Sequence, residues 1–118
     1  MTAKIYHNPR CSKSRQTLQL LRDKGIEPEI VKYLETPPDE AELTRLLDML
    51  GLKPRQLMRT KEALYRELGL GDESLSDARL IRAMVDNPRL IERPIVVDGH
   101  RAALGRPPEK VLELFQAG

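Results

Sequence analysis

The sequence predicts one α/β domain in which a helical segment separates two strand-containing halves. Two short strand-like segments near the N-terminus, residues 3–7 and 29–33, flank a helical pattern, which is typical of a strand–helix–strand unit. The middle of the chain carries leucines at helical spacing, and the last quarter holds two more short strands and a helix. The chain has 118 residues, which suits a single domain spanning residues 1–118.

The N-terminal segment contains the first strand–helix–strand unit. Residues 3–7 are expected to form a strand that ends at Asn8-Pro9, and a helix should begin near Cys11 and end at Gly25. Residues 29–33 form the second expected strand. This order within about thirty residues predicts a parallel pair of strands joined by a right-handed crossover.

The middle of the chain is expected to be helical. Prolines and acids at residues 37–40 suit a helix N-terminus, and the leucines between Leu43 and Leu50 repeat at helical spacing before Gly51 ends the run. Further helices are expected at 54–58, at 61–68, and from Ser76-Asp77 to Asn87-Pro88.

The C-terminal part is expected to form a hairpin and a last helix. Residues 95–97 form a strand, Asp98-Gly99 is a two-residue hairpin turn, and residues 101–104 form the return strand. A helix should begin near Pro107-Pro108-Glu109. This order is the thioredoxin-like layout, βαβ then ββα, with a helical insertion between its halves. Pro94 stands where such folds hold a cis-proline beside the reactive cysteine.

Composition and charge limit the cellular location and the binding partners that we expect for this protein. The formal net charge is +2, and acids and bases alternate along the expected helices, which argues against a protein that coats nucleic acid. No apolar run approaches the roughly 18 residues of a membrane span, and no hydrophobic signal segment follows Met1. The single cysteine excludes an internal disulfide and a zinc ribbon. We therefore expect a cytoplasmic monomer with neither a nucleic-acid nor a membrane partner.

The single cysteine, Cys11, stands at the expected start of a helix. Amide donors and the positive end of the helix dipole point at its sulfur, and Arg10, Lys13 and Arg15 add positive charge nearby in sequence. Such surroundings lower a thiol pKa from about 8.5 and also bind a tetrahedral oxyanion. The alternative interpretation is a buried, inert cysteine, but polar residues flank Cys11 on both sides.

Ser14 occupies the position where a dithiol redox protein carries its second cysteine. A Cys-x-x-Ser arrangement cannot close its own disulfide, so an adduct on Cys11 must be resolved by a thiol from outside the chain. Ser14 is expected to support the thiolate by hydrogen bonding. Its alternative role is that of a first-turn residue that bonds the backbone, and the two roles are compatible.

Four segments together resemble the glutaredoxin-coupled arsenate reductase family: residues 6–15, 33–38, 93–96 and 105–107. The resemblance covers nearly the whole chain. It implies an oxidoreductase of arsenic detoxification in which Cys11 attacks arsenate and forms a covalent thiol-arsenate adduct. Glutathione then joins as co-substrate, glutaredoxin takes the resulting mixed disulfide, and arsenite leaves. No bound cofactor and no metal are expected.

The resemblance also implies site residues. Three arginines hold the oxyanion in that family, and they match Arg59, Arg93 and Arg106. Guanidinium forks bind such a multiply charged anion through paired, charge-assisted hydrogen bonds. His7 matches a family histidine near the cysteine, where it would influence thiolate formation. Supporting roles are expected for Ser14, Arg15 and Pro94.

These side chains also have simpler interpretations. Arg59 would be a solvated helix residue, and His7 a strand-end residue satisfied by the backbone. Arg93 and Arg106 both precede prolines on loops that bound the hairpin, which favours a functional role for them. His100, in the hairpin turn, is expected only to be exposed.

Two other functions compete with arsenate reduction. One is a glutathione-dependent monothiol oxidoreductase or transferase that acts on another electrophile with little arsenate activity. The other is a regulator that binds RNA polymerase, as the Spx-type relatives do. Those relatives sense oxidation through a Cys-x-x-Cys pair, and Ser14 removes that switch. The full set of arginines favours the reductase.

Overall fold

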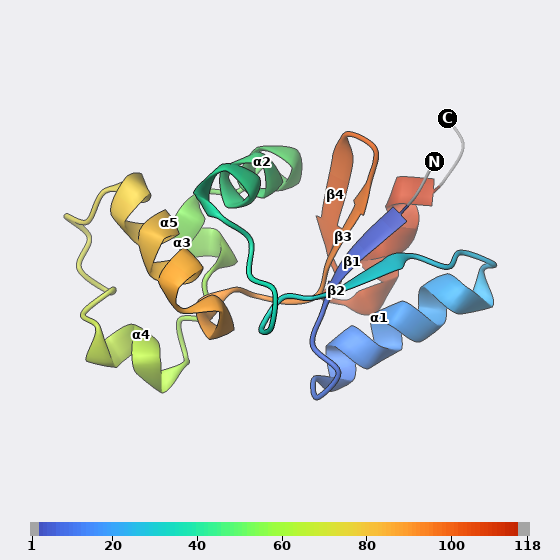
Figure 1. The fold of residues 1–118 in the computed structure, drawn as a ribbon, viewed down its shortest axis with the longest axis horizontal. Helices are drawn as coiled ribbons and strands as arrows, with labels where there is room; N and C mark the ends of the chain where they lie inside the picture. The colour runs from blue at the N-terminus through green and yellow to red at the C-terminus, as the bar shows by residue number, and fades with distance from the viewer. Residues whose placement is uncertain (1–2, 116–118) are drawn as a thin grey trace. The chain divides into compact units, whose positions relative to one another are not determined.

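A four-stranded mixed sheet is built from residues near both ends of the chain (Figure 1). The computed structural model describes residues 3–115. The strands are listed here in sheet order: β2 (Glu29–Lys32), β1 (Ala3–His7), β3 (Ile95–Asp98) and β4 (Arg101–Leu104). Strand β1 runs parallel to β2 and antiparallel to β3, so the predicted parallel βαβ pair and the C-terminal hairpin are both confirmed.

The chain divides into two compact units. The first unit comprises the residues up to Thr36 and those from Arg93 onward, and the second comprises Pro37–Glu92. The second unit therefore corresponds to the helical insertion that the sequence predicts. Each unit is described separately below, and single-domain behaviour stays a prediction.

Helix α1 (Ser12–Asp23) connects β1 to β2 within the first unit. The helix ends in a Schellman motif. The N–H of Gly25 donates to the carbonyl of Arg22, and the N–H of Ile26 donates to the carbonyl of Leu21, both at 2.9 Å. Gly25 has a φ of +79°, a conformation that favours glycine and explains why the helix stops where the sequence predicts.

The hydrophobic core of the first unit lies between the sheet and its helices. The last helix, η2 (Pro108–Phe115), is a 3₁₀ segment that packs against α1 and β4. The core side chains are Ile5, Leu18, Leu21, Val96, Val111 and Leu114. Each fully buried side chain of this kind contributes about 1.5–3 kcal/mol, so this core fixes α1 against the sheet.

The hairpin turn lies one residue later than the sequence predicts. Asp98 is the last residue of β3 and pairs with Arg101, so Gly99 and His100 form the two-residue loop. Gly99 has a φ of +63°, whereas no non-glycine residue within 3–115 has a positive φ. A positive φ at the first loop position alone is typical of a type II′ turn, and this explains why glycine takes that place. His100 is exposed, as expected.

The second unit is helical, as predicted, and glycine and polar caps delimit its helices. Asp39 caps α2 by accepting the N–H of Glu42 at 2.8 Å, and Ser76 caps α5 by accepting the N–H of Arg79 at 3.1 Å. The helices are α2 (Glu40–Leu50), α3 (Pro54–Leu57), α4 (Ala63–Glu67), α5 (Asp77–Asp86) and η1 (Pro88–Leu90). The short 3₁₀ turn η1 was not predicted. Across residues 3–115, no helix is long and apolar enough to cross a membrane.

Candidate active site

The loop between β1 and α1 delivers Cys11 to the start of a helix. Cys11 is the N-cap of α1 and is buried, with 8% of its surface exposed. Its N–H donates to the carbonyl of Asn8 at 3.0 Å, and the side-chain oxygen of Asn8 accepts the N–H of Arg10 at 3.0 Å. Arg15 Nη1 donates to the carbonyl of Pro9 at 2.9 Å. These bonds fold the loop tightly and hold the cysteine at the first turn.

The surroundings of Cys11 favour the thiolate. Burial raises the pKa of the thiol, but the backbone N–H of Ser14, the charge of Arg93, the backbone N–H of Lys13 and the charge of Arg106 all lower it. The lowering effects prevail, so the pKa of Cys11 lies below its ordinary value. The two guanidinium groups that act on the sulfur come from residues far from it in sequence, and the helix start supplies the amide donors.

Cys11 is therefore expected to react faster at neutral pH than a free cysteine in the absence of an oxyanion, because a larger fraction of its thiol is ionised. The rate of alkylation by iodoacetamide, measured against pH, should show a midpoint below the value of about 8.5 that is typical of free cysteine. A midpoint at or above that value would show that burial outweighs the amides and guanidinium groups.

Ser14 connects α1 to the end of β1. Its side chain is fully buried, and its Oγ lies 2.7 Å from Nδ1 of His7 and accepts the N–H of Asn8 at 3.0 Å. The hydroxyl therefore holds the histidine and the loop backbone, and Ser14 acts on Cys11 through its backbone N–H. The expected hydrogen bonding of Ser14 to the backbone is present.

His7 is buried at the end of β1, and its protonation is disfavoured. Burial lowers the pKa of His7, and the positive charges of Arg22, Lys32 and Arg15 lower it further. A neutral imidazole adds no positive charge to the site. In this structure His7 therefore acts on the site through its bond to Ser14.

Two arginine-proline steps bring positive charge to the cysteine. The Arg93–Pro94 and Arg106–Pro107 peptide bonds are both cis, and Pro94 takes the conformation that the thioredoxin-like layout predicts. Arg106 Nε donates to the carbonyl of Arg93 at 2.9 Å, and the N–H of Gly105 donates to the carbonyl of Pro94 at 2.9 Å. These bonds tie the two arginine loops together, and both charges act on Cys11.

Gly105 allows the chain next to Arg106 to pack closely against Pro94 and Thr17, a role that the sequence did not predict. A Cβ at Gly105 would lie 2.7 Å from Thr17 Oγ1 and 2.8 Å from Pro94 Cγ. Thr17 is fully buried and donates to the carbonyl of Lys13 at 2.8 Å, so it is not free to move away. A glycine between a predicted strand end and Arg106 was the signal that could have identified this contact.

Gly105→Ala is expected to destabilise the protein by about 1–3 kcal/mol, as overpacking of a filled site typically does. It should also lower the rate of Cys11 alkylation at neutral pH, because the Arg106 loop would be displaced. Gly71→Ala is the control, since its Cβ would lie 3.7 Å from Tyr65, an ordinary contact. Thermal unfolding and alkylation measure the two effects. Equal melting temperatures for the two variants would contradict the close-packing argument.

Arg59 belongs to the second unit. It forms an ion pair with Glu62, with Nη1 3.3 Å from Oε2, and its side chain is 28% exposed. The family role that the resemblance implies for Arg59 stays a prediction. Its backbone is well defined, since its N–H donates to the carbonyl of Leu90 at 2.7 Å.

Comparison with known proteins identifies the family of the chain. The model of the ArsC family matches residues 6–114. The chain belongs to the ArsC family. A solved structure of the "Arsenate reductase from Vibrio cholerae" superposes with a TM-score of 0.94 at 59% identity, covering 96% of this chain and 97% of that one. The fold is therefore thioredoxin-like, as predicted.

Curated ArsC-family relatives match over almost their whole length. The "Uncharacterized protein YfgD" of Escherichia coli (strain K12) is 64% identical over 112 residues, which is 94% of this chain and 94% of the relative. The "Arsenate reductase" of Neisseria meningitidis serogroup A is 53% identical over 109 residues, or 92% of this chain and 93% of the relative.

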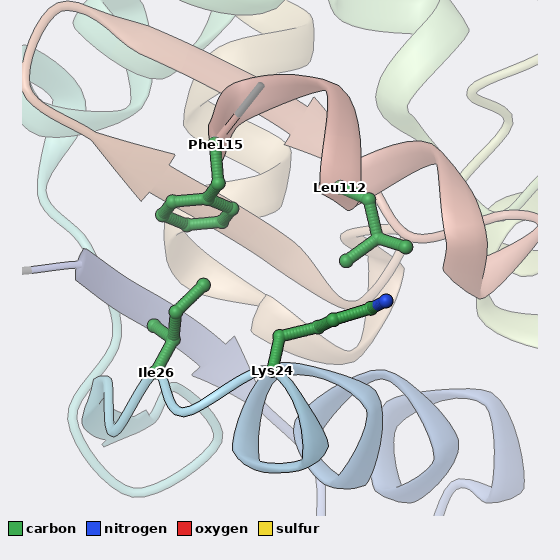
Figure 2. A pocket seen from close by; sticks show the side chains of 4 residues that line it. All are labelled: Lys24, Ile26, Leu112 and Phe115. Carbon is green, nitrogen blue, oxygen red and sulfur yellow. The ribbon is translucent and has the colours of Figure 1, made fainter. Parts of the chain in front are cut away.

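A cavity lies away from the cysteine of this ArsC-family chain. It has a volume of about 340 Å³ and is lined by Lys24, Ile26, Leu112 and Phe115 (Figure 2). Lys24 follows the C-terminal end of α1, whereas Cys11 precedes its N-terminal end, about 18 Å along a helix of 12 residues. The cavity thus contains no expected site residue. Within residues 3–115 no group of three or more potential metal-ligating side chains is found.

Proposed function

We propose that this chain reduces arsenate to arsenite, with Cys11 as the nucleophile. The observation that carries the proposal is the position of Cys11 at the N-cap of α1, where helix-start amides and the charges of Arg93 and Arg106 favour its thiolate, in a chain of the ArsC family. Relatives named arsenate reductase are about half identical to it over nearly its whole length. A thiolate beside two guanidinium groups suits an anionic, electrophilic substrate.

The chemistry needs both the thiolate and the cations. The Cys11 sulfur attacks the arsenic of arsenate, one arsenic oxygen leaves as water after taking up protons, and a sulfur–arsenic bond forms. Positive charge from Arg93 and Arg106 offsets the repulsion between the thiolate and the oxyanion, and it stabilises the charge on the oxygens. The amides of Lys13 and Ser14 stabilise the ionised form of the sulfur.

We propose glutathione as the second thiol and glutaredoxin as the protein that regenerates Cys11. When a disulfide forms between Cys11 and glutathione, two electrons pass to arsenic, the sulfur–arsenic bond breaks and arsenite leaves. Glutaredoxin then accepts the glutathione from this mixed disulfide, and the Cys11 thiolate returns. Two features support an external thiol: Cys11 is the chain's single cysteine, and the Ser14 hydroxyl is engaged by His7.

The test is arsenate-dependent oxidation of NADPH by the purified protein with glutathione, glutathione reductase and glutaredoxin. Oxidation should stop when any one of arsenate, glutathione or glutaredoxin is omitted. Thioredoxin with its own reductase, supplied in parallel, should not replace the glutathione system. No oxidation at millimolar arsenate would refute the proposal, and activity with thioredoxin alone would refute the glutathione coupling.

A further inference from the structure

The ionisation of Cys11 does not account for the two cations beside it in sequence. Arg10 precedes the cysteine, Lys13 follows it in the first turn of α1, and both side chains are exposed. The sequence predicts that these adjacent charges lower the pKa of Cys11. In the structure the charges that lower this pKa are those of Arg93 and Arg106, which leaves Arg10 and Lys13 available for another task.

The protein does not neutralise either of these two side chains. Among residues 3–115, Arg10 and Lys13 form no ion pair and no side-chain hydrogen bond. The sequence has no acid before Asp23, and the first turn of α1 contains none. Two exposed cations without an acid in the same turn create a positive potential in the solvent beside this end of α1.

We propose that Arg10 and Lys13 select the external thiol that reacts at Cys11: they attract small thiols, and the disulfides of such thiols, that carry carboxylates. The inference rests on the proposed function, which requires an external thiol, and it names the residues that recognise this thiol. Glutathione has the chemistry that the two cations favour, because it carries two carboxylates and one ammonium group.

The backbone that carries both cations is fixed beside the sulfur. The N–H of Arg10 donates to the side-chain oxygen of Asn8 at 3.0 Å, and the carbonyl of Lys13 accepts from Thr17 Oγ1 at 2.8 Å. An extended tripeptide spans about 10 Å, and in glutathione the sulfur belongs to the middle residue. Carboxylates at both ends therefore come within reach of long side chains next to Cys11 when the two sulfurs meet.

Exchange with a disulfide brings the same carboxylates to the same sulfur without any arsenate. The Cys11 thiolate attacks one sulfur of glutathione disulfide, a new sulfur–sulfur bond forms, the old one breaks, and one glutathione leaves as a thiolate. Arg10 and Lys13 are exposed, so each is expected to change the rate only modestly, and salt should weaken the effect by screening.

The test measures how fast the reduced protein reacts with three symmetrical disulfides: anionic glutathione disulfide, neutral bis(2-hydroxyethyl) disulfide and cationic cystamine. Mass spectrometry follows the adduct on Cys11, and each rate is divided by that of 2-mercaptoethanol with the same disulfide, which removes differences between the leaving thiols. At about 0.1 M salt the anionic disulfide should react fastest and the cationic one slowest. The difference should shrink at about 1 M salt, where the screening length falls from about 10 Å to about 3 Å.

Arg10→Gln and Lys13→Gln should each slow the reaction with glutathione disulfide roughly two- to fivefold at the lower salt concentration, the effect of one exposed charge pair. The neutral disulfide should stay within about twofold of its wild-type rate, because neither charge sets the ionisation of Cys11. The matched control is Lys24→Gln, which removes the same charge at the opposite end of α1 and should leave all three rates unchanged.

Three results would overturn the inference. The first is a wild-type protein that shows no preference among the three disulfides. The second is a preference for the anionic disulfide that persists in the double variant Arg10→Gln/Lys13→Gln, which would assign it to Arg93 and Arg106. The third is an equal slowing of the neutral and the anionic disulfide in the single variants, which would mean that the two cations act on the thiolate itself.

The exchange reactions contain no arsenate, so their outcome is separate from that of the proposed function. A protein that shows the preference but does not reduce arsenate would refute the proposed function alone. A protein that reduces arsenate without the preference would refute only the role of Arg10 and Lys13.

Discussion

Cys11→Ser should abolish arsenate reduction completely. Reduction of arsenate to arsenite takes two electrons, and an alcohol can supply neither the electrons nor a mixed disulfide. The measurement is arsenate-dependent NADPH oxidation, with circular dichroism to show that the variant folds. Serine is slightly smaller than cysteine and polar, so it should be tolerated at this position, where the loop backbone fixes the N-cap of α1.

Mass spectrometry gives the complementary result for the wild-type protein. Enzyme trapped with arsenate and glutathione should carry one added glutathione, located on Cys11, the single cysteine of the chain. Residual turnover in Cys11→Ser, or repeated turnover of the wild type in a buffer without thiols, would contradict the cycle.

Replacing Arg93 or Arg106 with alanine should lower kcat/KM for arsenate by roughly ten- to a hundredfold. This is the usual effect of losing one charge-assisted contact, about 1.5–3 kcal/mol. Both substitutions should also raise the alkylation midpoint of Cys11, because each removes a charge that lowers the pKa of its thiol. Lysine at either position should recover only part of the loss, since it keeps the charge but lacks the two-pronged geometry.

The control for these variants is Arg79→Ala on the exposed face of α5, which should leave the kinetics nearly unchanged. Arg79 is a better control than Arg82, because Arg82 pairs with Glu40 at 2.8 Å and with Asp86 at 3.3 Å. Small and equal losses of kcat/KM in the Arg93, Arg106 and Arg79 variants would show that these arginines contribute only a diffuse positive electrostatic field and do not contact the substrate.

Much of the fold could be predicted because local signals agreed with the tertiary structure. Gly25 and Gly51 both take positive φ values directly after helices, and Asp39 and Ser76 both cap helices, as their residue types indicate. The hairpin turn was misplaced by one residue, because Asp98-Gly99 and Gly99-His100 both suit a two-residue turn and only the pairing with β1 decides between them.

The site was harder to predict than the fold, because its electrostatics depend on contacts between segments far apart in sequence. The sequence predicts a cysteine at a helix start whose pKa is lowered by backbone amides, as found, and by the adjacent cations. In the structure two distant guanidinium groups do so, and Arg15 instead holds the loop through the carbonyl of Pro9. The closeness of Gly105 to Thr17 likewise has no local pattern, since Gly105 follows β4 and Thr17 lies in α1, far apart in sequence.

The hydrogen bonds of Ser14 oppose the introduction of a second cysteine beside Cys11. A cysteine at this position would create a dithiol motif, but its larger sulfur would enter a site with no exposed surface. It would also replace the strong bonds of the hydroxyl to His7 and Asn8 with the weak ones that sulfur makes. A cysteine at position 14 would therefore cost the hydroxyl's bonds to His7 and Asn8, and a chain that carries Cys11 with Ser14 cannot close a disulfide of its own.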